Sequence, residues 1–219
     1  MYVPQHVFSN SRLFEHRIDR YSGEDHVSGT IGSTEMRFSE IHAEYKTTTR
    51  DSKGRTRTEW HTLFKGLFFN ADFNKDFKGT TVIVPDVAER ALGSWLGGLL
   101  QSMNFTRSGE LIKLENPDFE KYFAVYGDDQ IEARYILTPS LMEKLVKFRE
   151  REETGNQVFI SFARSCMNIA IVTSSDRFEP RIIRTLVDFE MIKEFFLDFT
   201  LMTGIVEEMG LNTRIWTKQ

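Results

Sequence analysis

The stretch of residues 60–73 constrains the fold most, because it is apolar on both faces of a β-strand at Leu67-Phe68-Phe69. Successive side chains of a strand point to opposite faces of the sheet, so a strand of this kind has to be covered on each side. We therefore expect it to lie centrally in a sheet that is buried on both faces. The 19 phenylalanines of the chain supply apolar area for such a core.

The residues before this strand predict two more strands. Apolar residues alternate in three groups, which are Val27, Gly29 and Ile31, then Met36 and Phe38, then Ile41, Ala43 and Tyr45. The apolar residues change from even to odd positions near Ser39-Glu40, which is the pattern that a β-bulge produces. Gly32-Ser33 predicts the turn between these strands. Residues 46–59 are polar and contain Gly54, which predicts a loop.

The rest of the chain mixes strand and helix patterns. Further strands are expected at residues 80–84, 111–114, 122–126, 158–162 and 167–172. Helices are expected at residues 86–103, 130–136, from Pro139 onward, and 185–210. Leu13, Phe14 and Ile18 fit a short helix near the start of the chain. In the helix at 86–103, Gly93, Gly97 and Gly98 form a smooth face that suits close packing over a sheet, or a subunit contact.

These elements predict an α+β fold, in which a mainly antiparallel sheet packs with several helices and is closed by a long C-terminal helix. The arrangement is reminiscent of pleckstrin-homology-like domains. We expect one soluble domain over residues 1–219, with a polar N-terminal arm at 1–25 and the α+β core at 26–219. A single cysteine excludes an internal disulfide.

Several classes of function find no support in the sequence. The net charge of -4 argues against a nucleic-acid binder. No nucleophile elbow, P-loop or dinucleotide fingerprint is present. Cys166 is expected to behave as a small hydrophobe. His42 and His61 could approach each other across paired strands, but half-buried strand histidines are the better interpretation. We expect no cofactor.

One short run of residues resembles a calcium loop. Asp72, Asn74 and Asp76 match the first three ligand positions of such a loop, but Phe77 stands where the sharp turn requires glycine. A polar turn explains the run more simply. We therefore expect no metal ion here.

The most suggestive surface feature is a group of cations in the polar stretch. They are Lys46, Arg50, Lys53, Arg55 and Arg57, and the same stretch holds one acid, Asp51. Such a segment could contact anionic lipid headgroups, with each cation contributing about 1 kcal/mol near the surface. The plainer interpretation is a solvated loop.

A second candidate site is acidic. Asp128 and Asp129 are followed by Glu132 and Arg134, immediately before and within the helix expected at 130–136. Helix capping explains adjacent carboxylates at this place, with Asp129 as the cap and Glu132 three residues on. Binding of magnesium or a substrate is the alternative.

Several motifs together resemble a family of uncharacterised bacterial proteins, a domain of unknown function. The motifs are Phe64-Lys-Gly-Leu-Phe-Phe-Asn-Ala-Asp-Phe-Asn-Lys75, Leu114-Glu-Asn-Pro-Asp-Phe-Glu120 and Gly127-Asp-Asp-Gln-Ile-Glu-Ala-Arg-Tyr-Ile-Leu-Thr-Pro139. The resemblance implies membrane association, because members often carry transmembrane helices ahead of this domain. It therefore places the domain at the cytoplasmic side of a bacterial membrane where such an anchor exists, and in the cytoplasm otherwise. It implies no catalytic residue.

Two classes of function remain. The first is a non-catalytic binding module whose partner is an anionic membrane surface or another protein. The second is an enzyme with an acidic, metal-assisted site around Asp128, Asp129, Glu132 and Arg134. A deep pocket with these groups converging would favour the enzyme, whereas a shallow surface with the carboxylates engaged in caps would favour the module. We prefer the module because the sequence offers no nucleophile with a base and an orienting group.

Overall fold

The structure is a computed structural model, and it describes residues 1–14, 16–32, 34–50, 53–72, 78–85, 109–151, 158–172, 200, 203–204 and 206–207. An eight-stranded sheet dominates it, in the order β1-β2-β3-β8-β7-β4-β6-β5. The strands are β1 (Arg20–Ile31), β2 (Thr34–Arg50), β3 (Thr56–Asp72), β4 (Thr81–Pro85), β5 (Glu110–Ile112), β6 (Phe123–Gly127), β7 (Val158–Ala163) and β8 (Cys166–Val172). Every pair of neighbouring strands is antiparallel.

The described helices are short. They are α1 (Gln5–Asn10), α5 (Pro117–Glu120), α6 (Gln130–Ile136) and α7 (Pro139–Arg151). Asn116 and Asp129 cap α5 and α6 by accepting backbone N–H bonds, and Pro139 opens α7, as its sequence predicts. No helix of the described residues is both long and apolar enough to cross a membrane.

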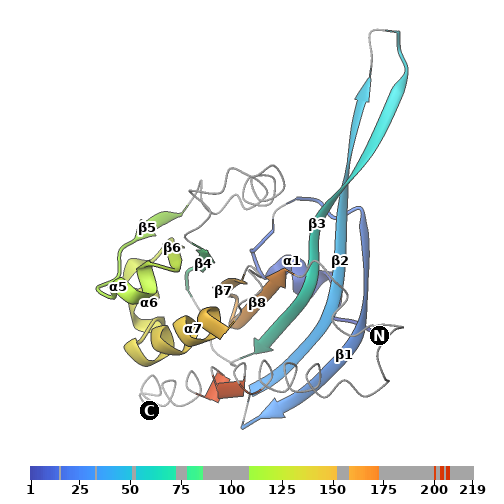
Figure 1. Cartoon of the computed structure of the whole chain (residues 1–219). Coiled ribbons are helices and arrows are strands. Elements are labelled where there is room, and N and C mark those ends of the chain that lie inside the picture. The colour runs from blue at the N-terminus through green and yellow to red at the C-terminus, as the bar shows by residue number, and fades with distance from the viewer. Residues whose placement is uncertain are drawn as a thin grey trace.

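The expected fold class, an α+β fold with several helices and a long C-terminal helix in the manner of pleckstrin-homology-like domains, is wrong. One large antiparallel sheet makes up most of the molecule, and the longest described helix, α7, has 13 residues (Figure 1). The sheet is larger than the sequence predicts, because the strands of the β2–β3 hairpin extend through the polar stretch for which a loop is expected. The helix expected at 86–103 lies outside the described residues. So does most of the one expected at 185–210, of which residues 200, 203–204 and 206–207 are described as helical.

Strand β2 contacts different cores along its length, and this explains the shift of its apolar residues from even to odd positions near Ser39-Glu40. Met36 and Phe38 belong to a core on one face of the sheet, whereas Ile41 and Ala43 belong to a core on the other. The shift from even to odd positions therefore marks a change of the covered face, with β2 paired to β3 without interruption from Glu35 to Ala43. A bulge is present at this level of the sheet, but its extra residue lies in the neighbouring strand β1: Glu24 pairs with Glu40 and Val27 with Phe38, so the bulge stands opposite Ser39.

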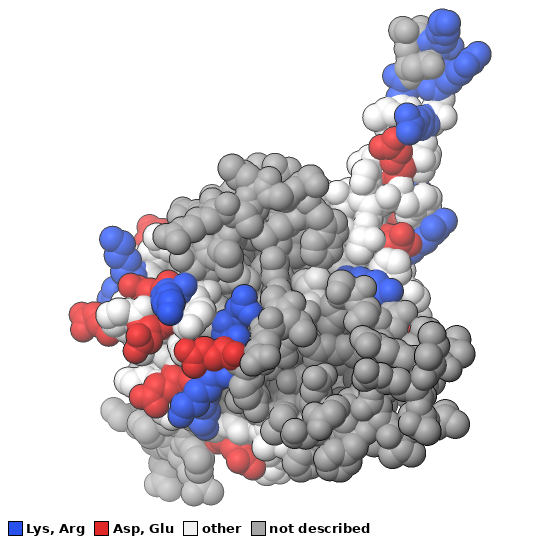
Figure 2. All heavy atoms as spheres, viewed as in Figure 1, with Lys and Arg blue, Asp and Glu red and all other residues white. Residues whose placement is uncertain are grey.

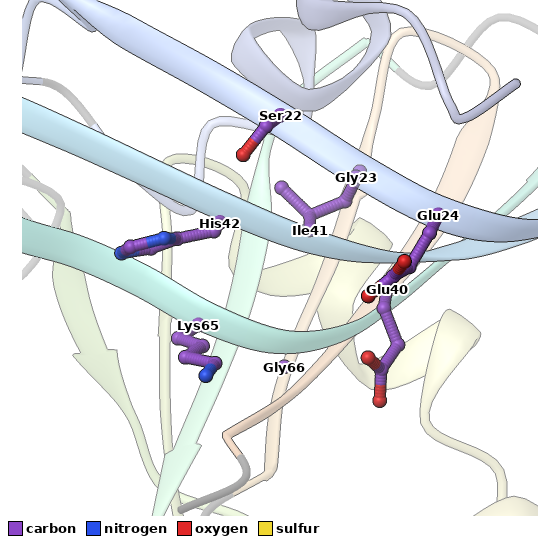
Figure 3. A pocket seen from close by; sticks show the side chains of 8 residues that line it. All are labelled: Ser22, Gly23, Glu24, Glu40, Ile41, His42, Lys65 and Gly66. Atoms are coloured by element: carbon purple, nitrogen blue, oxygen red, sulfur yellow. The ribbon is translucent and has the colours of Figure 1, made fainter. Parts of the chain in front are cut away.

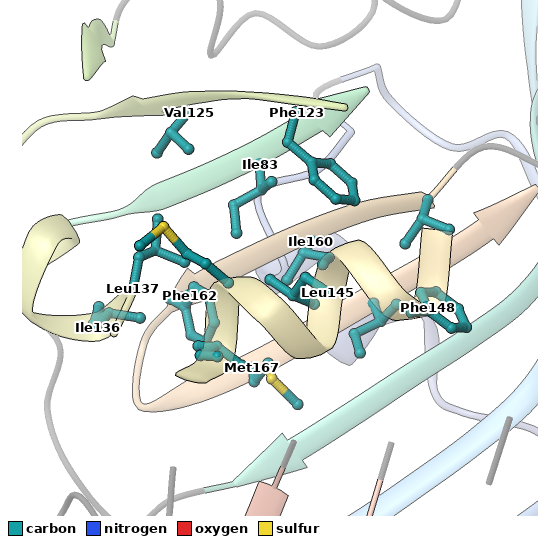
Figure 4. Packing of buried hydrophobic residues seen from close by; sticks show 14 of the residues in the cluster. Ile83, Phe123, Val125, Ile136, Leu137, Leu145, Phe148, Ile160, Phe162 and Met167 are labelled. Carbon is teal, nitrogen blue, oxygen red and sulfur yellow. The ribbon is translucent and has the colours of Figure 1, made fainter. Parts of the chain in front are cut away.

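Strand β3 is covered on both faces, as the sequence predicts. It lies between β2 and β8, with Phe69 in one core and Phe68 in the other. On the first face, helix α7 crosses the sheet, and its Leu145 and Phe148 join a cluster with Ile160 and Phe162 (Figure 4).

The opposite face is covered by residues 3–14. Val3, Phe8 and Phe14 are buried in the second core, and Phe8 stacks on Phe14 with ring centroids 5.0 Å apart. The stretch 1–25, expected as a polar arm, thus contributes apolar side chains to this core. The short helix expected around Leu13 and Phe14 lies earlier in the chain, at α1.

A row of polar side chains crosses the sheet on this same face. Asn70 on β3 donates to Asn168 on β8 at 2.9 Å, and Asn168 donates to Ser161 on β7 at 3.2 Å. Ser161 in turn donates to the backbone carbonyl of Ser11 at 2.5 Å. These buried groups satisfy one another only in the observed register, so the row ties the N-terminal segment to three strands.

We predict that Phe8→Ala destabilises the protein by about 3–5 kcal/mol, because it leaves a cavity where four aromatic rings meet. Denaturant unfolding measures the free energy change. Tyr135→Ala, at an exposed position on α6, is the control and should cost less than about 1 kcal/mol. A Phe8→Ala cost as small as that of the control would show that residues 3–14 do not belong to the core.

A second prediction concerns Tyr21, whose hydroxyl donates to the carbonyl of Val3 at 2.9 Å. Burial, together with the nearby Tyr2, raises the pKa of Tyr21 above its usual range. The unfolded chain ionises this group near pH 10, so the stability due to its raised pKa is present below about pH 10 and is lost as the pH rises above it, by up to about 1.4 kcal/mol per pH unit. Unfolding measured from pH 8 to 11 should show a steeper decline for the native protein than for Tyr21→Phe; parallel curves would contradict this role.

Candidate functional site

The β2–β3 hairpin extends far beyond the sheet and forms what we call the basic arm, residues 46–60 (Figure 1). Antiparallel pairing continues from Lys46↔Trp60 to Arg50↔Thr56, and every described residue of the arm is exposed. The loop expected at 46–59 is therefore wrong: it is a two-stranded ribbon with a turn at its tip. Its threonines were the missed signal, because β-branched residues favour strands even when they are fully exposed.

A bulge lies where the arm leaves the sheet. Ala43 pairs with Phe64 and Glu44 pairs with Thr62, so Leu63 is an extra residue in β3. Leu63 and Phe64 are both buried in the same core, which is where a bulge directs two successive side chains. The bulge gives the ribbon a local bend and extra twist at this point.

Two groups of side chains support the base of the arm, one on each face. On one face, the guanidinium of Arg20 lies 3.5 Å from the centre of the Trp60 ring and 3.7 Å from the carboxylate of Glu44. On the other face, the ring of Tyr45 stacks between the rings of His16 and His61, with centroids 4.4 Å and 5.0 Å from its own. A lone two-stranded ribbon is marginally stable in water, so these contacts hold the arm to the body. The sequence did not single out Arg20 or Trp60.

The five predicted cations lie along the arm and concentrate toward its tip, where Figure 2 shows basic side chains grouped at the end of the projecting ribbon. Lys46 is at the base, where its ammonium lies 3.9 Å from the carboxylate of Asp19. Arg50 donates to the carbonyl of Gly54 at 3.3 Å and so helps to close the turn. Arg57 forms an ion pair with Glu59 at 2.9 Å, and its side chain is 80% exposed. Lys53 and Arg55 complete the tip, so the structure brings all five cations onto one projecting element.

The acidic candidate residues lie at the start of α6, where their carboxylates hold backbone N–H groups. Asp129 accepts from Ile131 and Glu132, each at 2.9 Å. The carboxylate of Glu132 accepts from Lys78 at 2.9 Å and from Gly79 at 2.8 Å, and Asp128 accepts from Thr80 at 2.6 Å. A side chain at position 79 would collide with Asp128, so glycine permits this close approach.

The guanidinium of Arg134 donates to the backbone carbonyl of Lys113 at 3.5 Å, a group outside this cluster of carboxylates. Among the described residues, no group of three or more histidine, cysteine, aspartate or glutamate side chains is placed to hold a metal ion. Of the calcium-like run, Asn74 and Asp76 lie outside the described residues.

A polar hollow of about 280 Å³ lies on β1–β3 below the arm (Figure 3). His42 is flanked across the strands by Ser22 and Lys65, and Glu40 pairs with Glu24. His61 pairs with Tyr45, on the other face of the ribbon from His42, so these two histidines do not meet. Burial raises the pKa of the Cys166 thiol, which fits the expected role of a small hydrophobe.

Residues 62–211 match the model of the family described as "Protein of unknown function (DUF3137)". This span is more than half of the chain, and the chain belongs to this family, as the resemblance of its motifs indicates. The matched span begins just after the basic arm.

No curated protein sequence matches the chain. Among solved structures, the mycobacterial "trehalose monomycolate transport factor A, TtfA" is similar over 85% of this chain and 86% of that chain. The identity is 9% and the TM-score 0.37, a likeness too low to support an argument about this chain.

We predict that Glu132→Ala destabilises the protein by about 1–2 kcal/mol, because the backbone N–H groups of Lys78 and Gly79 lose their acceptor. Amide hydrogen exchange should show loss of protection at these two residues. Glu143→Ala, which removes an exposed carboxylate from α7, is the matched control and should change stability by less than about 0.5 kcal/mol. Unchanged protection at Lys78 and Gly79 in Glu132→Ala would contradict a structural role for this carboxylate.

Proposed function

We propose that this domain is a non-catalytic binding module of a membrane-associated bacterial protein, and that the tip of its basic arm binds anionic lipid headgroups at the cytoplasmic face of the membrane. The observation that carries the proposal is the arm itself. It is a ribbon exposed along its whole described length, supported at its base by Arg20, Tyr45 and their partners, with its cations gathered toward the far end.

The chemistry of the arm supports a superficial electrostatic contact. Residues 46–59 contain no aliphatic or aromatic side chain, so the tip has nothing to insert among acyl chains. Cations beside an anionic bilayer contribute about 1 kcal/mol each, and this attraction falls off within a Debye length. The contact is therefore reversible and sensitive to salt.

The acidic cluster supports the non-catalytic part of the proposal. Asp128, Asp129 and Glu132 each accept at least one backbone N–H bond, so their carboxylates have a structural use in this fold. This is the arrangement that favours a module over an enzyme. Membership of a family of unknown function is compatible with it.

The proposal predicts that the triple variant Lys53→Glu, Arg55→Glu and Arg57→Glu loses binding to vesicles that contain phosphatidylglycerol. Removing three cations at about 1 kcal/mol each weakens binding by about 3 kcal/mol, which is more than about a hundredfold in the dissociation constant. Vesicle sedimentation at physiological ionic strength measures the bound fraction. Neutral phosphatidylcholine vesicles should not bind the native protein.

The matched control is Lys113→Glu, Lys121→Glu and Lys147→Glu, which makes the same change in net charge at exposed positions of the body. This variant should bind nearly as well as the native protein. Equal loss of binding in both variants would show that net charge, and not the arm, determines the interaction. No binding of the native protein to anionic vesicles would reject the proposed function.

A further inference from the structure

We propose that a cavity near the start of β2 binds a small phosphate ester of a polyol, which is a molecule with a phosphate group and free hydroxyl groups. The cavity has a volume of about 460 Å³, within the range of sites for small molecules. Strands β1 and β2 and the first residues of the chain line it, and its lining includes the cationic side chain of Arg37. This site is separate from the membrane contact of the arm.

The row of buried polar side chains holds the guanidinium of Arg37 in a fixed position. Nε of Arg37 donates to Asn70 at 3.0 Å, and Asn70 donates in turn to Asn168 at 2.9 Å. The row continues through Ser161 to the backbone carbonyl of Ser11, so each member donates to the next. Nε of Arg37 is therefore occupied, whereas the two terminal nitrogens have no partner among the described residues and can bind a ligand.

Arg37 also has no counter-ion among the described residues. It is half-buried, yet none of the ion pairs between described residues includes it. Glu35 lies two positions away on the same face of β2, but it is exposed and does not pair with Arg37. A charged group that is removed from water normally has a partner of opposite charge. An anion in the cavity would supply the partner that Arg37 lacks.

The other donors of the cavity suit a phosphate better than a carboxylate. Ser28 is the cross-strand neighbour of Arg37, and Thr30 follows it on the same face of β1. Both residues line the cavity. A carboxylate offers two oxygens, which the two terminal nitrogens of one guanidinium can bind together, whereas a phosphate has a further oxygen for the hydroxyl groups.

Glu35 indicates what the phosphate is attached to. It pairs with Thr30 across the strands and lines the same cavity. An ionised carboxylate only accepts hydrogen bonds, so it repels a bare phosphate and favours hydroxyl groups at this place. The α-carbons of Glu35 and Arg37 are about 7 Å apart, which is two residues at about 3.4 Å each. A three-carbon polyol phosphate is long enough to contact both side chains.

The place of the cavity favours a soluble ligand over a lipid headgroup. Arg37 is near the start of β2 and Arg50 is at its end, thirteen positions further on. At about 3.4 Å per residue, this separates them by about 44 Å along the strand. Figure 1 shows the start of β2 and the arm at opposite ends of the molecule. When the tip of the arm contacts a bilayer, the headgroups of that bilayer therefore lie far from the cavity.

The first experiment is a titration with glycerol 3-phosphate, inorganic phosphate and acetate. The backbone amide resonances of Ser28, Thr30 and Arg37 report binding, in the native protein and in the triple variant of the arm described above. We expect the same shifts in both proteins, at severalfold lower concentrations of glycerol 3-phosphate than of phosphate, and only weak shifts with acetate. No shift with glycerol 3-phosphate, equal affinity for acetate, or loss of the shifts in the arm variant would overturn the proposal.

The variant Arg37→Gln tests the guanidinium itself. The amide nitrogen of glutamine can take the place of Nε and donate to Asn70, so the buried row keeps its first donor. This variant should weaken binding of glycerol 3-phosphate at least about tenfold and leave vesicle binding and the free energy of unfolding nearly unchanged. Lys147→Gln removes an exposed cation from α7 and is the matched control, which should bind as the native protein does. Equal affinity of Arg37→Gln and the native protein would overturn the proposal.

A second variant, Glu35→Ala, tests the polyol. Loss of the carboxylate removes the acceptor for the hydroxyl groups and the repulsion of bare phosphate. The preference for glycerol 3-phosphate over inorganic phosphate should therefore shrink severalfold. An unchanged preference would overturn the assignment of the ligand as a polyol phosphate.

Discussion

The buried row from Asn70 through Asn168 to Ser161 is the constraint on which the rest of the sheet depends. Each amide or hydroxyl of the row is buried, and each finds its partner on the neighbouring strand. A slip of one residue would turn these groups to the other face and leave them without partners, at a cost of about 1–3 kcal/mol for each. The hydrogen bond from Ser161 to Ser11 extends this control to the segment that covers the second core. Strand register and the position of the N-terminal segment are therefore fixed together.

The sequence predicted those elements whose signal is local. The central strand at Leu67-Phe68-Phe69, the turn at Gly32 and the Asp129 cap follow from alternation, backbone freedom and capping, which act within a few residues. The same reasoning predicted the five cations as one group but not the element that holds them. A two-stranded ribbon depends on pairing between residues 46–50 and 56–60, and their polarity resembled that of a loop.

Long-range packing was the part that the sequence could not provide. The change of covered face along β2 requires knowledge of what lies on each side of the sheet. The sequence therefore attributes the shift to a bulge near Ser39, and the structure places the extra residue of that bulge in β1, opposite Ser39. In the same way, the support of Trp60 by Arg20 joins two strands that are separated by β2 in the sheet. Capping by Asp129 follows from the local sequence, whereas the hydrogen bonds that Lys78 and Gly79 donate to Glu132 join segments more than fifty residues apart. Such contacts leave no periodic signal.

The extra residue at Leu63 has a geometrical consequence for the arm. A bulge increases strand twist and bends the ribbon where it occurs, and this one lies at the last buried position before the exposed pairs begin. The direction of the arm is therefore determined at its root, about 17 Å or more from the cations at its end. Deletion of this one residue would return the ribbon toward the plane of the sheet. The cationic end would then face a different direction while its charge and composition stayed the same, so orientation and affinity can change independently of each other.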